Sequence, residues 1–409
     1  MYLSQIDTLV AHVYIPTATQ YFASFLRCLE EWERLSPYES MNGQFRDLEI
    51  LTYPERTHGH WHAFQTPFPP LPECTQTVLL EFRIYDQEQK EDSHQWPVEV
   101  IYRSTACWTI PFPELWAFTL SVLQTIGDIS IAKETFLSRI SRIDLAIDTD
   151  QFQWHAEDRI KFVTRAKTNA QFILQAQPDE DDVDFETATS TLNTASYHVG
   201  EQFTGFTFGK GNILCRIYNK WFEISQNHSY KNAKRFFADL WQEAGWDKTR
   251  DVWRIEFQLR RAALHQFKIP DTEISFAHTD VPTGVQHIFS LLPYLLLEWI
   301  TYREPNGNQN RSKWPMDTIW LHMAQTLTGY MPPSERKPLP PQYDATLLAK
   351  TLRGYLSAFA VASQISTSAE LLETLPALLA HTLSLSQEEL YSMLDTEIRR
   401  KAALTGCWL

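Results

Sequence analysis

The sequence predicts an α+β protein in which an antiparallel or mixed sheet with covering helices precedes an all-helical C-terminal region. Alternating apolar and polar residues, typical of strands, recur through the first 270 residues and are interrupted by amphipathic helices. After Pro270 strand patterns vanish and helical periodicity continues to the end of the chain. We therefore expect two domains, 1–270 and 271–409. With 409 residues, 44% of them hydrophobic, the chain can bury a large core.

Periodicity and turn residues place the individual elements. In the first domain we expect strands at 9–14, 77–85, 98–103, 141–147, 203–208, 213–222 and 252–261. The expected helices there cover 17–35, 113–125, 156–170 and 230–244. Gly209 to Asn212 joins two of these strands and is typical of a hairpin turn. The C-terminal helices are expected at 285–303, 315–328, 345–363, 369–383 and 386–403, with a proline-rich linker at 332–341.

Charge and cysteine content narrow the class of protein. The net charge of -14 argues against nucleic-acid binding by the chain as a whole. Residues 205–270, however, hold twelve Lys and Arg against six Asp and Glu, which is an excess of six positive charges. Five scattered cysteines without CxxC spacing, and no long apolar run, favour a reduced cytoplasmic protein without a membrane span.

Three separated strands share one pattern. Successive strand residues point to opposite faces, so each of these strands has one apolar face and one face of charged or hydroxyl-bearing side chains. If the strands are neighbours in one sheet, the polar faces bring together Arg142, Asp144, Asp148, Arg216, Tyr218, Lys220, Arg254 and Glu256. The alternative is an ordinary solvent-facing ladder of ion pairs.

This set of side chains has a specific chemistry. Two or three carboxylates bind a hard divalent cation, which polarises a phosphoryl oxygen. A tyrosine hydroxyl is a useful nucleophile near neutral pH only beside a cation, and Lys220 or the metal could supply that charge. Arginine matches phosphate oxygens in pairs. The pattern therefore indicates phosphoryl transfer to Tyr218.

The order of these segments resembles the replication-initiator family of staphylococcal-type rolling-circle plasmids and the related relaxases of integrative elements. The resemblance covers about residues 5–265. It is carried by Gln5-Ile6-Asp7, Arg142-Ile143-Asp144 with Asp148, Phe208-Gly209-Lys210-Gly211, Arg216-Ile217-Tyr218-Asn219-Lys220, Arg254-Ile255-Glu256 and Leu259-Arg260. In that family the tyrosine attacks the nicking site and leaves a 5′-phosphotyrosine and a free 3′-hydroxyl.

The resemblance implies a role for each matched residue. Tyr218 is the expected nucleophile, assisted by Lys220, and the expected ligands of Mg²⁺ or Mn²⁺ are Asp144 and Glu256, with Asp148 as a helper. The phosphate and DNA contacts are expected from Arg216, Arg254, Arg142 and Lys210. Residues 1–270 would be the nicking and joining domain. The implied partner is DNA at an origin or transfer site, single-stranded or cruciform, with a helicase and a second copy of the chain as further candidates.

Two alternatives remain open at this point. The acidic net charge also fits a DNA-binding or assembly protein that retains the initiator fold without its activity. In addition, a histidine cluster runs from His58 to His62, and its His60-Trp61-His62 part matches the His-hydrophobic-His pattern of another nicking superfamily, in which two histidines on a strand bind the metal. Gly59 and the polar residues before it favour a loop with surface histidines instead.

Overall fold

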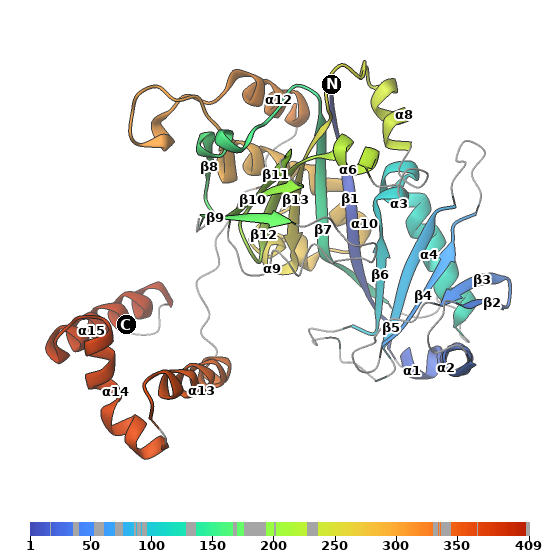
Figure 1. Ribbon diagram of the computed structural model, residues 1–409. Coiled ribbons are helices and arrows are strands. Elements are labelled where there is room, and N and C mark those ends of the chain that lie inside the picture. Colours follow the sequence, from blue (N-terminus) through green and yellow to red (C-terminus); the bar gives the residue numbers. More distant parts are fainter. Residues whose placement is uncertain are drawn as a thin grey trace. The chain divides into compact units, whose positions relative to one another are not determined.

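In the computed structural model the chain forms two compact units, 1–337 and 338–409 (Figure 1). The structure describes residues 1–16, 18–35, 41–52, 61–69, 77–85, 87, 91, 96–127, 136–166, 170–175, 194–199, 202–226, 236–329, 334, 336, 345–365 and 367–405. The predicted boundary at residue 270 lies inside the first unit. The reason is packing, because Leu291, Trp299 and Trp320 are buried in the same hydrophobic core as the sheet.

The first unit is built on a sheet whose strand order is β2-β3-β4-β5-β6-β1-β7-β13-β12-β11-β10-β9. Its pairings are antiparallel except for the parallel pair β9–β10, so the sheet is mixed as predicted. The strands are β1 (Tyr2–Tyr14), β2 (Met41–Phe45), β3 (Leu48–Thr52), β4 (Trp61–Pro67), β5 (Leu79–Tyr85), β6 (Val98–Tyr102), β7 (Leu137–Thr149), β9 (Ala170–Gln175), β10 (Thr194–Val199), β11 (Gln202–Phe208), β12 (Ile213–Asn219) and β13 (Trp253–Arg260).

Helices cover the sheet and fill the second unit. The α-helices of the first unit are α1 (Ala18–Tyr21), α2 (Ala23–Leu35), α3 (Ser104–Thr109), α4 (Phe112–Ile126), α6 (Lys220–Gln226), α8 (Phe236–Glu243), α9 (Arg261–Leu264), α10 (Val281–His287), α11 (Leu292–Tyr294) and α12 (Thr318–Thr328). The second unit holds α13 (Ala345–Ala362), α14 (Ser368–Thr382) and α15 (Gln387–Thr405), close to the predicted ranges. Within the described residues no helix is both long and apolar enough to cross a bilayer.

The central strands alternate as the sequence predicts. On one face Ile143, Leu145 and Ile147 of β7 are fully buried with Ile255, Phe257 and Leu259 of β13. This apolar face packs on segments that follow β13: Gly284 of α10 lies against Ile140, and Trp299 contacts Phe257 edge-on. The opposite face carries the polar residues, and α3 and α8 cover one end of it.

Two segments differ from the predicted helices. Of the segment 156–170, the described part up to residue 166 contains the 3-10 helix η2 (Ala156–Lys161) and the strand β8 (Phe162–Thr164), and β9 begins at Ala170. Residues 285–303 are broken into short helical turns, η4 (Ile288–Leu291), α11 and the π-helix η5 (Leu295–Trp299), which end in the strand β14 (Ile300–Tyr302). β14 pairs with β8, so a strand exists after residue 270. Aromatic packing of Phe162 against Tyr302 and Trp320 outweighs local helical periodicity here.

Candidate functional site

Three adjacent strands carry the predicted site residues. β7, β13 and β12 are neighbours, and Asp144, Glu256 and Tyr218 lie on them with their side chains on the polar face. The register places Arg216 opposite Glu256, and Tyr218 opposite Arg254. Long polar side chains on this face therefore meet across the strands.

A hydrogen bond joins the tyrosine to the glutamate. The Tyr218 hydroxyl donates to Glu256 Oε2 at 2.9 Å, while Arg216 Nη1 donates to Glu256 Oε1 at 3.0 Å. Glu256 is buried, whereas Tyr218 is partly exposed. Burial, and then the charge of Glu256, raise the pKa of Tyr218 well above its ordinary value. The phenol is therefore neutral in this state and has a proton acceptor in place.

Gly205 of β11 allows this arrangement. It pairs with Tyr218, and a Cβ at residue 205 would come within 2.9 Å of the Cβ of Tyr218 and within 2.4 Å of the Ile217 carbonyl oxygen. These separations are shorter than van der Waals contact, so any side chain here would push β11 and β12 apart. Tyr197 occupies the next position in this row, opposite Gly205 on β10.

Asp144 is the second carboxylate of the cluster. Arg142 donates to it through two nitrogens, Nε at 2.9 Å and Nη2 at 2.7 Å. The pKa of Asp144 is raised to about 6, chiefly by burial and also by the charge of Glu256, while Arg142 and Arg216 oppose the shift. Asp144 and Glu256 nevertheless repel each other, and a cation between the two carboxylates would relieve that repulsion.

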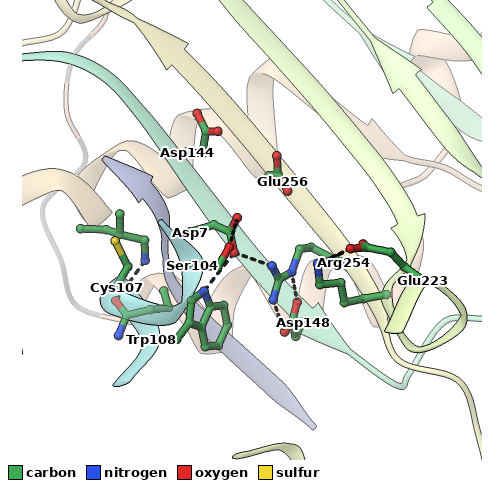
Figure 2. A network of polar contacts seen from close by, with 12 residues as sticks. Asp7, Ser104, Cys107, Trp108, Asp144, Asp148, Glu223, Arg254 and Glu256 are labelled. Carbon is green, nitrogen blue, oxygen red and sulfur yellow. Dashed lines mark hydrogen bonds and ion pairs between the residues drawn. The ribbon is translucent and has the colours of Figure 1, made fainter. Parts of the chain in front are cut away.

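A separate network lies further along the same face. Arg254, fully buried, donates through Nε and Nη2 to Asp148 at 2.6 and 2.8 Å, and it also pairs with Asp7 through Nη1 at 2.5 Å. Figure 2 shows this group apart from Asp144 and Glu256. Asp148 and Arg254, expected to serve a metal and a phosphate, are thus bound to each other.

Helices α3 and α8 close that network. Trp108 of α3 donates to Asp7 at 3.1 Å and Ser104 to its other oxygen at 3.0 Å (Figure 2). Trp241 of α8 donates to Asp148 at 2.9 Å. The rings of Trp108 and Phe237 lie 4.9 and 4.6 Å from the Arg254 guanidinium carbon. Every charged group here has matched partners in a dry setting.

The remaining predicted residues lie at the edges of the cluster. Lys220 is buried, pairs with Glu223 at 3.0 Å, and has its ammonium 5.4 Å from the centre of the Tyr218 ring rather than at the hydroxyl. Lys210 is exposed in the turn at the opposite end of β12 from Tyr218. His58 and His60 lie outside the described residues, whereas His62 is part of β4.

Residues of the second network were only partly indicated by the sequence. Asp7 belongs to the Ile-Asp segment of the resemblance, but nothing predicted its pairing with Arg254, which a break in the β1–β7 register at residue 7 permits. The sequence did not mark Trp108, Trp241 or Ser104 as parts of this network. For the two tryptophans the reason is that aromatic residues in amphipathic helices usually pack in the core. In the part of the chain that the structure describes, no three His, Cys, Asp or Glu side chains are grouped for a metal ion.

Comparison with known proteins identifies no family. No family model matches the chain, and no curated protein does. Among solved structures, the rolling circle replication initiator protein from Geobacillus stearothermophilus superposes with a TM-score of 0.38 and 13% identity, over 80% of this chain and 97% of that one. A similarity at this level establishes neither a shared fold nor an activity, so the function has to be inferred from the site itself.

Proposed function

We propose that the chain nicks and rejoins one DNA strand by phosphoryl transfer to Tyr218, as a rolling-circle replication initiator or relaxase does. The observation that carries the proposal is the hydrogen bond from the Tyr218 hydroxyl to Glu256, whose other oxygen is held by Arg216. A tyrosine hydroxyl with a fixed carboxylate acceptor and a guanidinium beside it suits attack on a phosphodiester.

The proposed step uses these three side chains. Tyr218 Oη attacks phosphorus while its proton passes to Glu256 Oε2, 2.9 Å away. The new bond joins Oη to phosphorus, the bond from phosphorus to the 3′ oxygen breaks, and that oxygen leaves as a hydroxyl after taking a proton from water. Arg216 offers its guanidinium to the phosphate oxygens. The reverse reaction rejoins the strand.

A divalent cation would assist this step. Asp144 and Glu256 are two buried carboxylates whose charges repel each other. Mg²⁺ is commonly held by one or two carboxylates together with substrate phosphate and water, so two ligands are enough. When bound, Mg²⁺ or Mn²⁺ would neutralise charge on the phosphate. Arg142 keeps Asp144 oriented, and the Arg254 network keeps β7 and β13 in register.

The test is covalent capture of the tyrosine. Wild-type protein, circular single-stranded phage DNA and supercoiled plasmid would be incubated with Mg²⁺ or Mn²⁺ and resolved under denaturing conditions. We expect a protein–DNA adduct that Tyr218→Phe abolishes. Tyr197→Phe is the matched control, because Tyr197 lies in the same row of the same sheet, and it should leave the adduct unchanged. An adduct that survives Tyr218→Phe would refute the assignment.

The competing function is DNA binding or assembly without strand cleavage. It is favoured by the raised pKa of Tyr218, by the ion pairs that already occupy both carboxylates, and by the net charge of -14. Under this alternative the protein retains single-stranded DNA on a filter, yet forms no adduct with either metal on either DNA. Binding by wild type and Tyr218→Phe would then be equal.

A further inference from the structure

A cavity of about 530 Å³ lies on the first unit at the start of β7. Five separate segments line it: the loop before β6 through Trp96, α4 through Trp116, β7 through Arg139, α9 through Arg261, and the turn before α10 through His278. Its volume lies within the range of sites that hold small molecules or single nucleotides. The cavity is open to solvent, and the five segments meet at it.

Two guanidinium groups give the cavity its charge. Arg139 stacks on Trp96 with its guanidinium carbon 3.8 Å from the ring centre. Among the residues that the structure describes, none accepts a hydrogen bond from the buried Nη1 of Arg261. Burial lowers the pKa of both arginines, and the charge of Arg261 lowers that of Arg139 further. Two desolvated like charges side by side favour an anion between them.

Two acidic residues, Asp280 and Glu91, also line the cavity. Asp280 accepts hydrogen bonds from the Thr283 backbone nitrogen at 2.8 Å and from its hydroxyl at 3.0 Å, so it is engaged in capping α10. Glu91 borders the cavity through the loop that leads to Trp96. His278 adds a third nitrogen-bearing side chain, held by a contact of its Nδ1 with the Ser275 hydroxyl at 2.9 Å.

The sheet connects this cavity to the Tyr218 site. Arg142 and Arg260 are paired across β7 and β13, two residues beyond Asp144 and Gln258 in the direction of the cavity. Arg260 is exposed and directly precedes Arg261. The five residues from Asp144 to Arg139 span about 15 Å of strand. Arginine thus continues along the sheet from the carboxylate cluster to the cavity.

We propose that this cavity, formed around Arg139, Arg261 and Trp116, binds one nucleotide of the single DNA strand that flanks the scissile phosphate. The proposal rests on the proposed function. A phosphate of the strand lies between Arg139 and Arg261, and a base stacks on Trp116, which is partly exposed whereas Trp96 is already covered by Arg139. Aromatic stacking next to arginine–phosphate contacts is how proteins hold single strands without reading their sequence.

The test measures binding apart from cleavage. Full-length Tyr218→Phe protein would be titrated into fluorescein-labelled oligodeoxythymidylate of about twelve nucleotides, followed by anisotropy over a series of salt concentrations. We expect Arg261→Gln to weaken binding about tenfold or more and to reduce the slope of log K against log salt by about 0.7, the value for one phosphate contact on a single strand. Trp116→Ala should weaken binding about tenfold without changing the slope.

Controls separate the cavity from general charge. Arg311→Gln removes one exposed arginine of η6 (Arg311–Lys313) and should change neither affinity nor slope. If thermal unfolding shows that Arg261→Gln is unstable, Arg261→Lys takes its place. This variant keeps the positive charge and should retain most of the binding. Equal binding by Arg261→Gln and the parent protein, or equal losses in Arg311→Gln, would overturn the proposal.

Free nucleotide is the competing ligand with the same chemistry. Thymidine monophosphate should fail to displace the oligonucleotide when both are present at the concentration at which the oligonucleotide saturates the protein. If it displaces the oligonucleotide and needs Arg261 to do so, the cavity serves a free nucleotide and the strand assignment is wrong. An adduct at Tyr218 together with unchanged binding in Arg261→Gln would refute this inference alone. Arg261-dependent binding without an adduct would refute the proposed function alone.

Discussion

Asp144 and Asp148 lie four residues apart on the same face of β7, yet their surroundings differ. Asp148 receives two hydrogen bonds from Arg254 and one from Trp241 of α8. Asp144 has Arg142 on one side and a second carboxylate, Glu256, on the other, and its pKa is raised to about 6. Asp148 is thus paired with Arg254 and Trp241, whereas Asp144 has a second carboxylate beside it as well as its arginine partner.

The contrast distinguishes a structural network from the cluster that we propose to be reactive. Arg254 lies between two carboxylates that also accept hydrogen bonds from Trp108 and Ser104 of α3 and from Trp241 of α8, so the charged groups of this network are paired within it. The Asp144–Glu256–Tyr218 cluster has a carboxyl group with a raised pKa and a tyrosine side chain that is partly exposed. Perturbed titration in a partly accessible cluster is typical of functional sites.

The largest effect is expected from breaking the structural network. Arg254→Leu leaves Asp7 and Asp148 buried without their counter-charge and should lower the free energy of unfolding by about 3–5 kcal/mol. Arg142→Leu should cost clearly less, because Asp144 can take up a proton and Arg142 is partly exposed. Urea unfolding at neutral pH measures both. Equal losses would mean that the two clusters do not differ as described.

Next in size is the effect of Glu256 on adduct formation. Glu256→Gln keeps the shape of the side chain but removes the proton acceptor of Tyr218, so the adduct should form at least about 100-fold more slowly. Asp148→Asn, in the structural network, is the comparison. It should reduce stability, yet among the molecules that remain folded the rate should stay within a few-fold of wild type. Single-turnover gels give both rates.

The third prediction concerns pH. Because folding raises the pKa of Asp144 from its ordinary value of 3.8 to about 6, the folded state holds the proton more tightly. The stability that this proton gives is present below about pH 4 and is lost as pH rises through 6, by up to about 3 kcal/mol. Asp144→Asn should remove this decline. Parallel pH profiles for wild type and variant would contradict the assignment.

The smallest effect is that of a divalent cation on stability. Mg²⁺ or Mn²⁺ at several times its dissociation constant should stabilise the wild-type protein by about 1–2 kcal/mol at pH 7. Asp144→Asn should lose this gain, whereas Asp148→Asn should retain it. Thermal unfolding with and without chelator measures the shift. A gain that disappears in Asp148→Asn but not in Asp144→Asn would place the ion in the other cluster.

The sequence predicted the face but not the partners. Alternation alone placed Asp144, Glu256 and Tyr218 on polar faces, and β7, β12 and β13 lie within a few residues of the predicted strands. The side-chain partners could not be predicted from the sequence, because they depend on how the strands pair. Arg254 lies opposite Asp148 since β13 runs antiparallel to β7 in this particular register. The prediction of a helix at 156–170 was wrong for a similar reason. Phe162 belongs to a cluster with Tyr302, 140 residues away in the sequence.

The most direct test of the central claim is to map the covalent adduct. Protein linked to DNA would be digested with trypsin and nuclease, and the peptide carrying the residual nucleotide would be sequenced by mass spectrometry. We predict a phosphotyrosine linkage at Tyr218, in the peptide that follows Arg216 and ends at Lys220. Linkage to any other tyrosine, or to serine, would contradict the assignment of the Asp144–Glu256–Tyr218 cluster as the reactive one.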